Sequence, residues 1–287
     1  MNIFDKLKNY IKKDKSFELT SDEKEQQTLI IYDHIINELN QYEQELAVLR
    51  KLNKSKDDYE KIVEDKILSY IEENDEVLTI QNEYGSNIGM LAADLKLENI
   101  VLRSLDNPIA STQQNTYREN IGIRSACNRL ERATLKALDN HEASLQCDEF
   151  GLNIGMMAAN CEMENVVLKA LDNKEACRHI DLWGDNLGIY CARERFHDAT
   201  LKALDNEEMS THINNTGASM AYLISLYGLK DCLKKVLLKY PETIESFSDG
   251  CSQQMRQDIQ EIKAEIEQDK LIEENLDNNL EIENEQN

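Results

Sequence analysis

Apolar residues in the middle of the chain follow a helical period that starts again every 33 residues. In the clearest unit they fall on one face of a helix with about 3.6 residues per turn: Met163, Val166, Val167, Ala170 and Leu171. A shorter stretch of small and apolar residues, 153–159, precedes this helix, and the segment 148–151 (Asp-Glu-Phe-Gly) has the composition of a turn. Each unit is therefore predicted to be a turn, a short helix, a tight turn and a second helix.

Two short motifs keep the same phase through these units. Leu-Asp-Asn begins at residues 105, 138, 171 and 204, and Asn-(Ile/Leu)-Gly begins at residues 87, 120, 153 and 186. Asn173, just after the second helix, is predicted to end that helix in the left-handed conformation, which Asn tolerates better than most residues. Since neither helix is long enough to be stable alone, the units are expected to stack. The sequence thus predicts an all-α solenoid of about five repeats.

The pattern divides the chain into four segments. Residues 1–19 are a basic amphipathic segment, residues 20–74 a helical hairpin or N-terminal cap, residues 75–241 the repeat array, and residues 242–287 an acidic tail. The tail is expected to begin as an amphipathic helix and to be disordered after about Asn275. The positions that favour this helix are Met255, Ile259, Ile262 and Ile266.

The N-terminal cap leaves two arrangements open. Thr20-Ser21-Asp22-Glu23 is a candidate capping box that would begin a helix reaching about Leu52. This helix either packs in a hairpin with residues 59–74 or forms the seam of a coiled coil. The apolar positions that favour a seam are Leu29, Tyr32, Ile36, Leu39, Leu46 and Leu49.

The composition limits the compartment and the partners. A net charge of -23 argues against binding nucleic acid or an anionic membrane over most of the surface, and membrane contact is expected at most through residues 1–15. No apolar run approaches the roughly 20 residues that span a bilayer, and the start of the chain lacks the apolar core of a signal peptide. Seven cysteines without a Cys-x-x-Cys pair indicate reduced thiols. We therefore expect a cytoplasmic protein; secretion into a host cell without a signal peptide is the alternative.

The unit from Asp148 to Ala159 resembles the ankyrin repeat, a family with a 33-residue period and the signature Asp-x-x-Gly-x-Thr-Pro-Leu-His-x-Ala-Ala. The chain is identified on these residues as a divergent, bacterial-type member. In place of Thr-Pro it has Asn-Ile or Asn-Leu, and in the second unit Arg118 stands at the turn glycine. The resemblance implies a stack with protruding turns and a concave groove that binds another protein.

No residue pattern points to catalysis. The five histidines lie outside any known metal or nucleophile motif, and Cys177-x-His179 supplies too few ligands for a metal. His179 and His212 occupy equivalent positions, but units stacked about 10 Å apart would keep them from sharing one ion. The sequence therefore predicts no enzyme, no metal and no cofactor.

The candidate site consists of columns, which are residues that recur 33 positions apart and so line up along the stack. One column is aromatic and lies beside the turn glycine: Tyr84, Tyr117, Phe150 and Trp183. These rings are interpreted either as anchors for a partner or as a stiffening row in which each ring packs on the next turn. A second column varies from unit to unit and would line the groove, unless it fills the space beside the glycines of the first helices: Leu91, Arg124, Met157 and Tyr190.

A third column pairs charges. Arg103, Lys136, Lys169 and Lys202 each precede an aspartate by three residues, which puts each pair on one helix face. Stacking also alternates the signs between neighbouring units, so a ladder of charges on the surface is predicted. The leading hypothesis for function is a non-enzymatic scaffold, with a bacterial effector as one variant, that binds one protein through the groove and the turn tips. The alternative is a charge-acting protein whose acidic tail binds a basic partner or mimics nucleic acid. Neither the partner nor the oligomeric state follows from the sequence.

Overall fold

The computed structural model describes residues 20–52, 55–245 and 252–285. Within these ranges there is no β-strand, and 71% of the structure is helical, so the all-α prediction is confirmed. The only strand-like pairings described are two isolated bridges, Cys147 with Asn153 and Ile213 with Ser219. No helix in the described part of the chain is both long and apolar enough to cross a membrane. The basic segment 1–15 lies outside the described residues.

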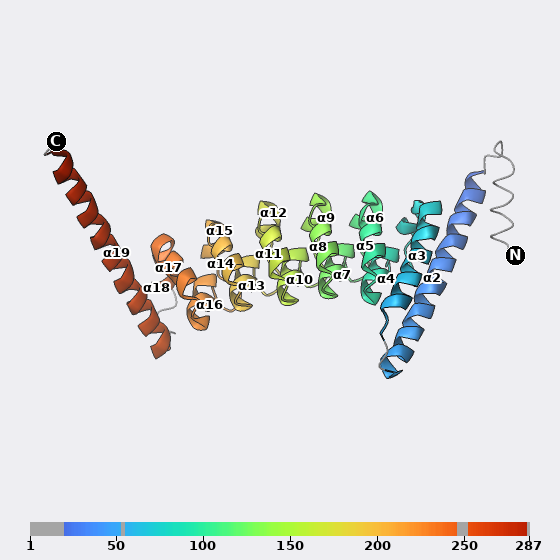
Figure 1. The fold of residues 1–287 in the computed structure, drawn as a ribbon, viewed down its shortest axis with the longest axis horizontal. Helices are drawn as coiled ribbons and strands as arrows, with labels where there is room; N and C mark the ends of the chain where they lie inside the picture. Colours follow the sequence, from blue (N-terminus) through green and yellow to red (C-terminus); the bar gives the residue numbers. More distant parts are fainter. Residues whose placement is uncertain (1–19, 53–54, 246–251, 286–287) are drawn as a thin grey trace.

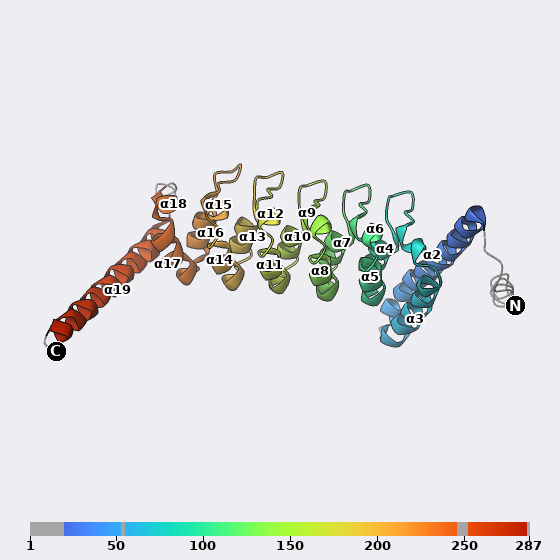
Figure 2. The same ribbon diagram turned by 90° about the horizontal axis from the view of Figure 1, so that it is seen from above.

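Five units stack side by side between two long terminal helices (Figure 1). The first helices of the units form one layer: α4 (Ile88–Leu95), α7 (Ile121–Cys127), α10 (Ile154–Asn160), α13 (Leu187–Arg193) and α16 (Met220–Tyr227). The second helices form a parallel layer: α5 (Glu98–Leu105), α8 (Glu131–Ala137), α11 (Glu164–Ala170), α14 (His197–Ala203) and α17 (Lys230–Lys239). Seen from above, the loops between units project side by side along one edge (Figure 2).

A short third helix follows each second helix, which the sequence did not predict: α6 (Pro108–Thr112), α9 (His141–Leu145), α12 (Lys174–Cys177), α15 (Glu207–Thr211) and α18 (Pro241–Glu245). The predicted left-handed role of Asn173 is wrong. Its backbone is extended (φ -89°, ψ 99°), and its side-chain oxygen accepts hydrogen bonds from the N–H groups of Glu175 and Ala176 at the start of α12. Asn serves here as an N-cap because a new helix with free N–H groups begins at once.

The left-handed conformation occurs instead between the first and second helices. Lys96, Arg129, Glu162, Arg195 and Gly228 recur there with φ between 60° and 67°. Four of the five are not glycine, so the sequence carries little sign of this conformation.

The Asn-(Ile/Leu)-Gly motif joins neighbouring units. Each Asn is an N-cap of the first helix; the Asn120 side chain accepts a hydrogen bond from the N–H of Ile123 (2.9 Å) and donates one to the carbonyl of Ala143 (2.9 Å). The glycine receives the apolar residue of the next unit's motif, since a Cβ on Gly122 would overlap the Ile154 side chain. The space beside these glycines is therefore filled by the next unit's Ile, Leu or Met, together with residues of the second and third helices, and not by the variable column.

The predicted ladder of charges is present between units, but the lysines do not pair with the aspartates of their own units. The Nζ atom of Lys169 lies 2.6 Å from Asp139 of the preceding unit and donates a hydrogen bond to the Leu135 carbonyl (2.7 Å). Lys136, Lys202 and Lys235 repeat both contacts. Each lysine therefore binds the carboxyl-terminal end of the preceding unit's second helix, where a cation is favourable.

The ends of the stack are covered by long helices. α2 (Ser21–Leu52) and α3 (Asp57–Glu73) form a hairpin that packs on the first unit, and η1 (Asp75–Thr79) links α3 to the array. Thr20 and Glu23 exchange capping hydrogen bonds at the start of α2. The buried face of α2 contains Ile31, Ile35, Leu39, Tyr42 and Leu46, whereas Leu29 of the predicted seam is exposed.

At the other end, α19 (Gln253–Glu285) packs on α16 and α17 through the predicted apolar positions Met255, Ile259, Ile262 and Ile266, and then projects beyond the stack (Figure 1). The helix continues past Asn275, where the sequence predicted disorder. The four-segment division of the chain stays a prediction.

Candidate functional site

The loop tips of the five units form one row with a repeated turn. In the third unit the Asp148 carboxylate accepts hydrogen bonds from the N–H groups of Phe150 (2.9 Å) and Leu152 (2.7 Å), and Gly151 takes a positive φ of 82°. Arg118, at the glycine position of the second unit, has the same conformation (φ 62°). The turns predicted from the 33-residue period are therefore equivalent in structure, including the one in which Arg118 replaces the glycine.

Backbone hydrogen bonds join each tip to the next. The N–H of Thr116 donates to the carbonyl of Tyr84, and the same bond links Glu149 to Tyr117, Leu182 to Phe150 and Asn215 to Trp183, at 2.9–3.1 Å. The carbonyl that accepts is always that of the column residue beside the turn. These bonds hold the five loops in register, so side chains on the tips are presented from a connected row.

The aromatic column lies on these tips. Tyr84, Tyr117, Phe150 and Trp183 are 47–58% exposed. Phe150 and Trp183 stack, with ring centroids 6.2 Å apart and ring planes 18° apart. The Phe150–Trp183 pair therefore stiffens the row, as the interpretation of a stiffening row expects. All four residues also remain about half exposed, as the interpretation of partner anchors expects.

Three further apolar residues extend this surface and were missed by sequence reasoning. Ile180, Leu182 and Ile213 are 49–66% exposed in the last two loops. The earlier units carry Gln81, Gln114 or Cys147 in the isoleucine column, and Glu83, Thr116 or Glu149 in the leucine column. The change from mainly polar to apolar within a column was a visible signal. We call the set Phe150, Ile180, Leu182, Trp183 and Ile213 the tip patch.

The variable column lies on the first helices below the tips. Leu91, Arg124 and Met157 are half-buried, and Arg124 forms ion pairs with Asp94 and Glu119. Tyr190 is only 3% exposed; its hydroxyl donates to the Asp181 carboxylate (2.7 Å). Burial, together with this hydrogen bond, raises the pKa of Tyr190 well above its usual value. Its ring therefore supports the surface and offers little area to a partner.

Two hollows lie between the tips and the first helices at equivalent positions, two units apart. The Tyr117 hollow has a volume of about 240 Å³ and is lined by Tyr117, Glu119, Arg124, Asp148, Glu149 and Phe150. The Trp183 hollow has a volume of about 430 Å³ and is lined by Asn160, Trp183, Asp185, Tyr190, Arg193, Asn214 and Thr216. Asp185 forms an ion pair with Arg193 and accepts a hydrogen bond from Asn214 at the base of the second hollow.

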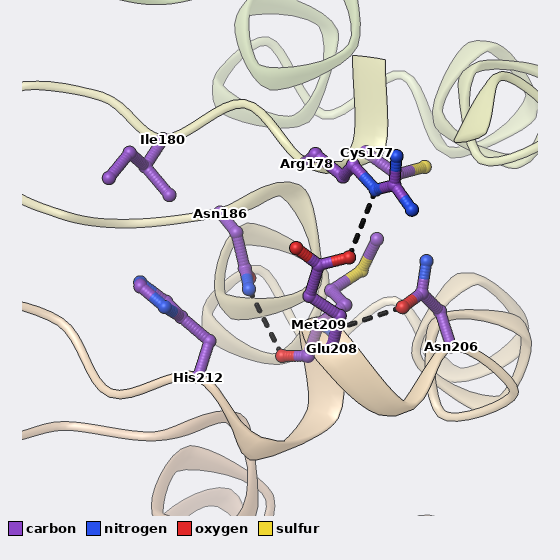
Figure 3. A pocket seen from close by; sticks show the side chains of 8 residues that line it. All are labelled: Cys177, Arg178, Ile180, Asn186, Asn206, Glu208, Met209 and His212. Carbon is purple, nitrogen blue, oxygen red and sulfur yellow. Dashed lines mark hydrogen bonds and ion pairs between the residues drawn. The ribbon is translucent and has the colours of Figure 1, made fainter. Parts of the chain in front are cut away.

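A third hollow, between α12 and α15, has a volume of only about 50 Å³ (Figure 3). Arg178 and Glu208 form an ion pair across it (3.0 Å), and Asn186 donates a hydrogen bond to the Met209 carbonyl (3.0 Å). His212 lines it, and its ring hydrogen-bonds the Gly184 carbonyl at 2.6 Å. His179 does the same to Gly151 at 2.8 Å. The two equivalent histidines therefore tether successive loop tips.

Over residues 20–52, 55–245 and 252–285, no group of three or more His, Cys, Asp or Glu side chains is placed to hold a metal ion. The cysteines of these ranges are free thiols: Cys127 is exposed, Cys147 and Cys161 are half-buried, and Cys177, Cys191 and Cys232 are buried.

Comparison with known proteins adds little to this geometry. No family model matches the sequence, and no curated protein matches it. Among solved structures, a chain from a complex of a predatory endopeptidase from Bdellovibrio bacteriovorus with an immunity protein aligns at a TM-score of 0.48 and 16% identity. The alignment covers 61% of this chain and 92% of that chain. At this level it does not establish a shared fold.

One sequence-based prediction is nevertheless corrected. The expectation that the chain is not an enzyme is contradicted, because the complex that contains the aligned chain includes an endopeptidase.

Proposed function

We propose that the chain is a divergent ankyrin-type repeat protein that binds another protein through its loop tips and the groove beneath them. The 33-residue unit, the turns with a residue of positive φ and the row of projecting loops support the family resemblance. The observation that carries the binding role is the tip patch, because five large apolar side chains that are 47–66% exposed lie on three neighbouring loop tips joined by hydrogen bonds.

Such a surface suits protein recognition physically. Contiguous exposed apolar patches with a polar surround are typical of interaction sites, and aromatic side chains supply large contact areas at low entropic cost. Because the backbone bonds between tips already fix the loops, little further ordering is needed on binding. Tyr84, Tyr117, Phe150 and Trp183 are the proposed anchors, with Leu91, Arg124 and Met157 contributing from the groove.

The acidic tail was the basis of the alternative function. Its first half packs on α16 and α17 through Met255, Ile259, Ile262 and Ile266, which gives that half a role in covering the end of the stack. The tip patch is therefore favoured over the tail as the binding surface. The cytoplasmic location, with secretion into a host cell as the alternative, stays a prediction.

Affinity capture by the full chain tests the proposed function. Proteins recovered by the wild type are compared with those recovered by Phe150→Ala, Trp183→Ala and Leu238→Ala. Leu238 is a matched control, since it is 54% exposed but lies on the second helix α17. Loss of one partner with the two tip variants, but not with Leu238→Ala, would support the proposal. Equal recovery by all variants would remove the tips from the site.

A further inference from the structure

The row of aromatic rings stops one unit before the loops do. The column runs Tyr84, Tyr117, Phe150 and Trp183, and its fifth member is Thr216. Thr216 is exposed on the last tip, and its hydroxyl donates to the Asn214 side chain (2.8 Å). One side of Trp183 is covered by the stacked Phe150 ring. Toward Thr216, Trp183 faces the Trp183 hollow instead of another ring.

The two equivalent hollows differ in volume and in the residue at this column position. In the Tyr117 hollow both column positions hold rings, Tyr117 and Phe150, and the volume is about 240 Å³. In the Trp183 hollow the second position is Thr216, and the volume is about 430 Å³. The larger value falls within the range of about 300–1,000 Å³ that is usual for ligand pockets. Thr216 lines the larger hollow at the column position where a fifth ring would stand.

We propose that the Trp183 hollow binds an aromatic side chain of the protein partner, which stacks on Trp183 and completes the row. This rests on the proposed function and names the chemistry of its anchor. The partner contributes the ring from an exposed segment, because the hollow is open between the last two tips.

The lining of the hollow favours a neutral ring over a charged side chain. Arg193 opposes a second cation, and Asp185, whose side chain is 4% exposed, opposes an anion. Those two groups already form an ion pair with each other, and the Tyr190 hydroxyl is engaged by Asp181. An uncharged ring breaks none of these contacts. The amide of Asn160 and the hydroxyl of Thr216 remain at the lining for the polar edge of a tyrosine or tryptophan.

The single tryptophan of the chain makes the hollow directly measurable. The fluorescence of Trp183, excited at the long-wavelength edge where neither tyrosine nor phenylalanine absorbs, and its indole N–H signal in NMR spectra report on this residue alone. The probe is N-acetyl-phenylalaninamide titrated into the full-length protein, and N-acetyl-leucinamide is the matched apolar control. We expect a saturable change in both signals with the phenylalanine amide. The leucine amide should bind at least about tenfold more weakly.

Two variants at one exposed position separate the hollow from general surface binding. Thr216→Phe supplies the missing ring from within, so binding of the phenylalanine amide should weaken by about tenfold or more. Thr216→Ser keeps the hydroxyl and the open hollow, so binding should stay within about twofold. Circular dichroism checks that both variants are folded. Equal binding of the two amides, or unchanged binding by Thr216→Phe, would overturn the proposal.

The same variants distinguish this inference from the proposed function. If a captured partner depends on Trp183 but binds Thr216→Phe as well as the wild type, the tips bind protein while the hollow holds no ring, and the inference alone is overturned. If the phenylalanine amide binds as expected but no partner depends on the tips, the hollow is real and the proposed function fails.

Discussion

Ile121 occupies the space that a side chain on Gly89 would need. A Cβ atom on Gly89 would lie 2.5 Å from Cδ1 of Ile121 and 2.7 Å from Cβ of Ser104. Atoms at such separations overlap, so the backbone of α4 can approach the next unit this closely only with glycine. The contact recurs between Gly122 and Ile154, which makes the glycine of the Asn-(Ile/Leu)-Gly motif a packing requirement.

Gly89→Ala should therefore destabilise the protein by about 1–3 kcal/mol through overpacking. The sign of this change in stability is diagnostic, because replacing glycine with alanine inside a helix otherwise stabilises a protein by about 1 kcal/mol. Ile121→Val removes the Cδ1 atom and should relieve part of the strain. In chemical denaturation, the double variant should lose at least about 0.5 kcal/mol less than the sum of the single variants. An unchanged stability of Gly89→Ala, or strictly additive effects of the two substitutions, would contradict the close packing of Ile121 against Gly89.

Asn120 tests the other half of the motif. It is fully buried, and its side chain both caps α7 and hydrogen-bonds Ala143 of the third helix α9 and Gln146, the residue that follows this helix. Asn120→Ala removes the cap and leaves buried groups unpaired, so we expect a loss of about 2–4 kcal/mol in the free energy of unfolding. Asn160→Ala, at an exposed position on α10, is the control and should change it by less than about 0.5 kcal/mol. Similar losses for both variants would show that the capping bonds contribute little.

The repeat period and the two-helix unit followed from the sequence because phase and apolar spacing are read directly from residue types. The function of Asn173 did not, since asparagine favours both a helix N-cap and a left-handed helix end, and only the backbone decides. The third helices are too short to show a period. The alternation of charges between units was predicted, but the choice of Asp139 over Asp172 as the partner of Lys169 was not. Lys169 reaches an aspartate 30 residues earlier, and spacing along one helix contains no information on that distance.

The placement of the candidate residues was predicted in part, while their role in binding stays a prediction. Exposure of the aromatic column followed from its place beside the turn glycine, and the structure places all four rings on the tips. Tyr190 was grouped with groove residues, but it is buried because Asp181 and Arg193 lie against it. The hollow beside Thr216 depends on the distance between loops, which residue types do not specify.

His197 should titrate at a higher pH than an ordinary histidine. Its ring lies 3.0 Å from Asp198 and 3.2 Å from Asp231 on α17, and these hydrogen bonds raise its pKa above 6.5. Because the folded-state pKa is the higher one, the stabilisation by charged His197 is complete below about pH 6.5 and is lost as the pH rises through the folded pKa. In NMR titrations, Asp231→Asn should move the His197 pKa back toward 6.5. A pKa that this change leaves unaltered would show that the contact between the units is not formed in solution.

Thiol reactivity should follow burial. Burial raises the pKa of Cys177 and Cys232 to about 11 and that of Cys191 further still, so these thiols hold little of the reactive thiolate at neutral pH. Cys127 is exposed. With iodoacetamide and mass spectrometry, Cys127 should be labelled first among the six cysteines of the described residues, and the three buried ones only after unfolding. Early labelling of Cys191 in the folded protein would contradict its place between the helix layers.

The most direct test of the central claim is the affinity of the full chain for a purified partner that it captures. The Trp183→Ala variant should weaken this affinity by about 30-fold or more, because a buried aromatic anchor at the centre of an interface contributes at least about 2 kcal/mol. The Leu238→Ala variant, which loses an equally exposed side chain on α17, should bind within about twofold of the wild type. Equal affinities of the two variants and the wild type would contradict a binding site on the loop tips.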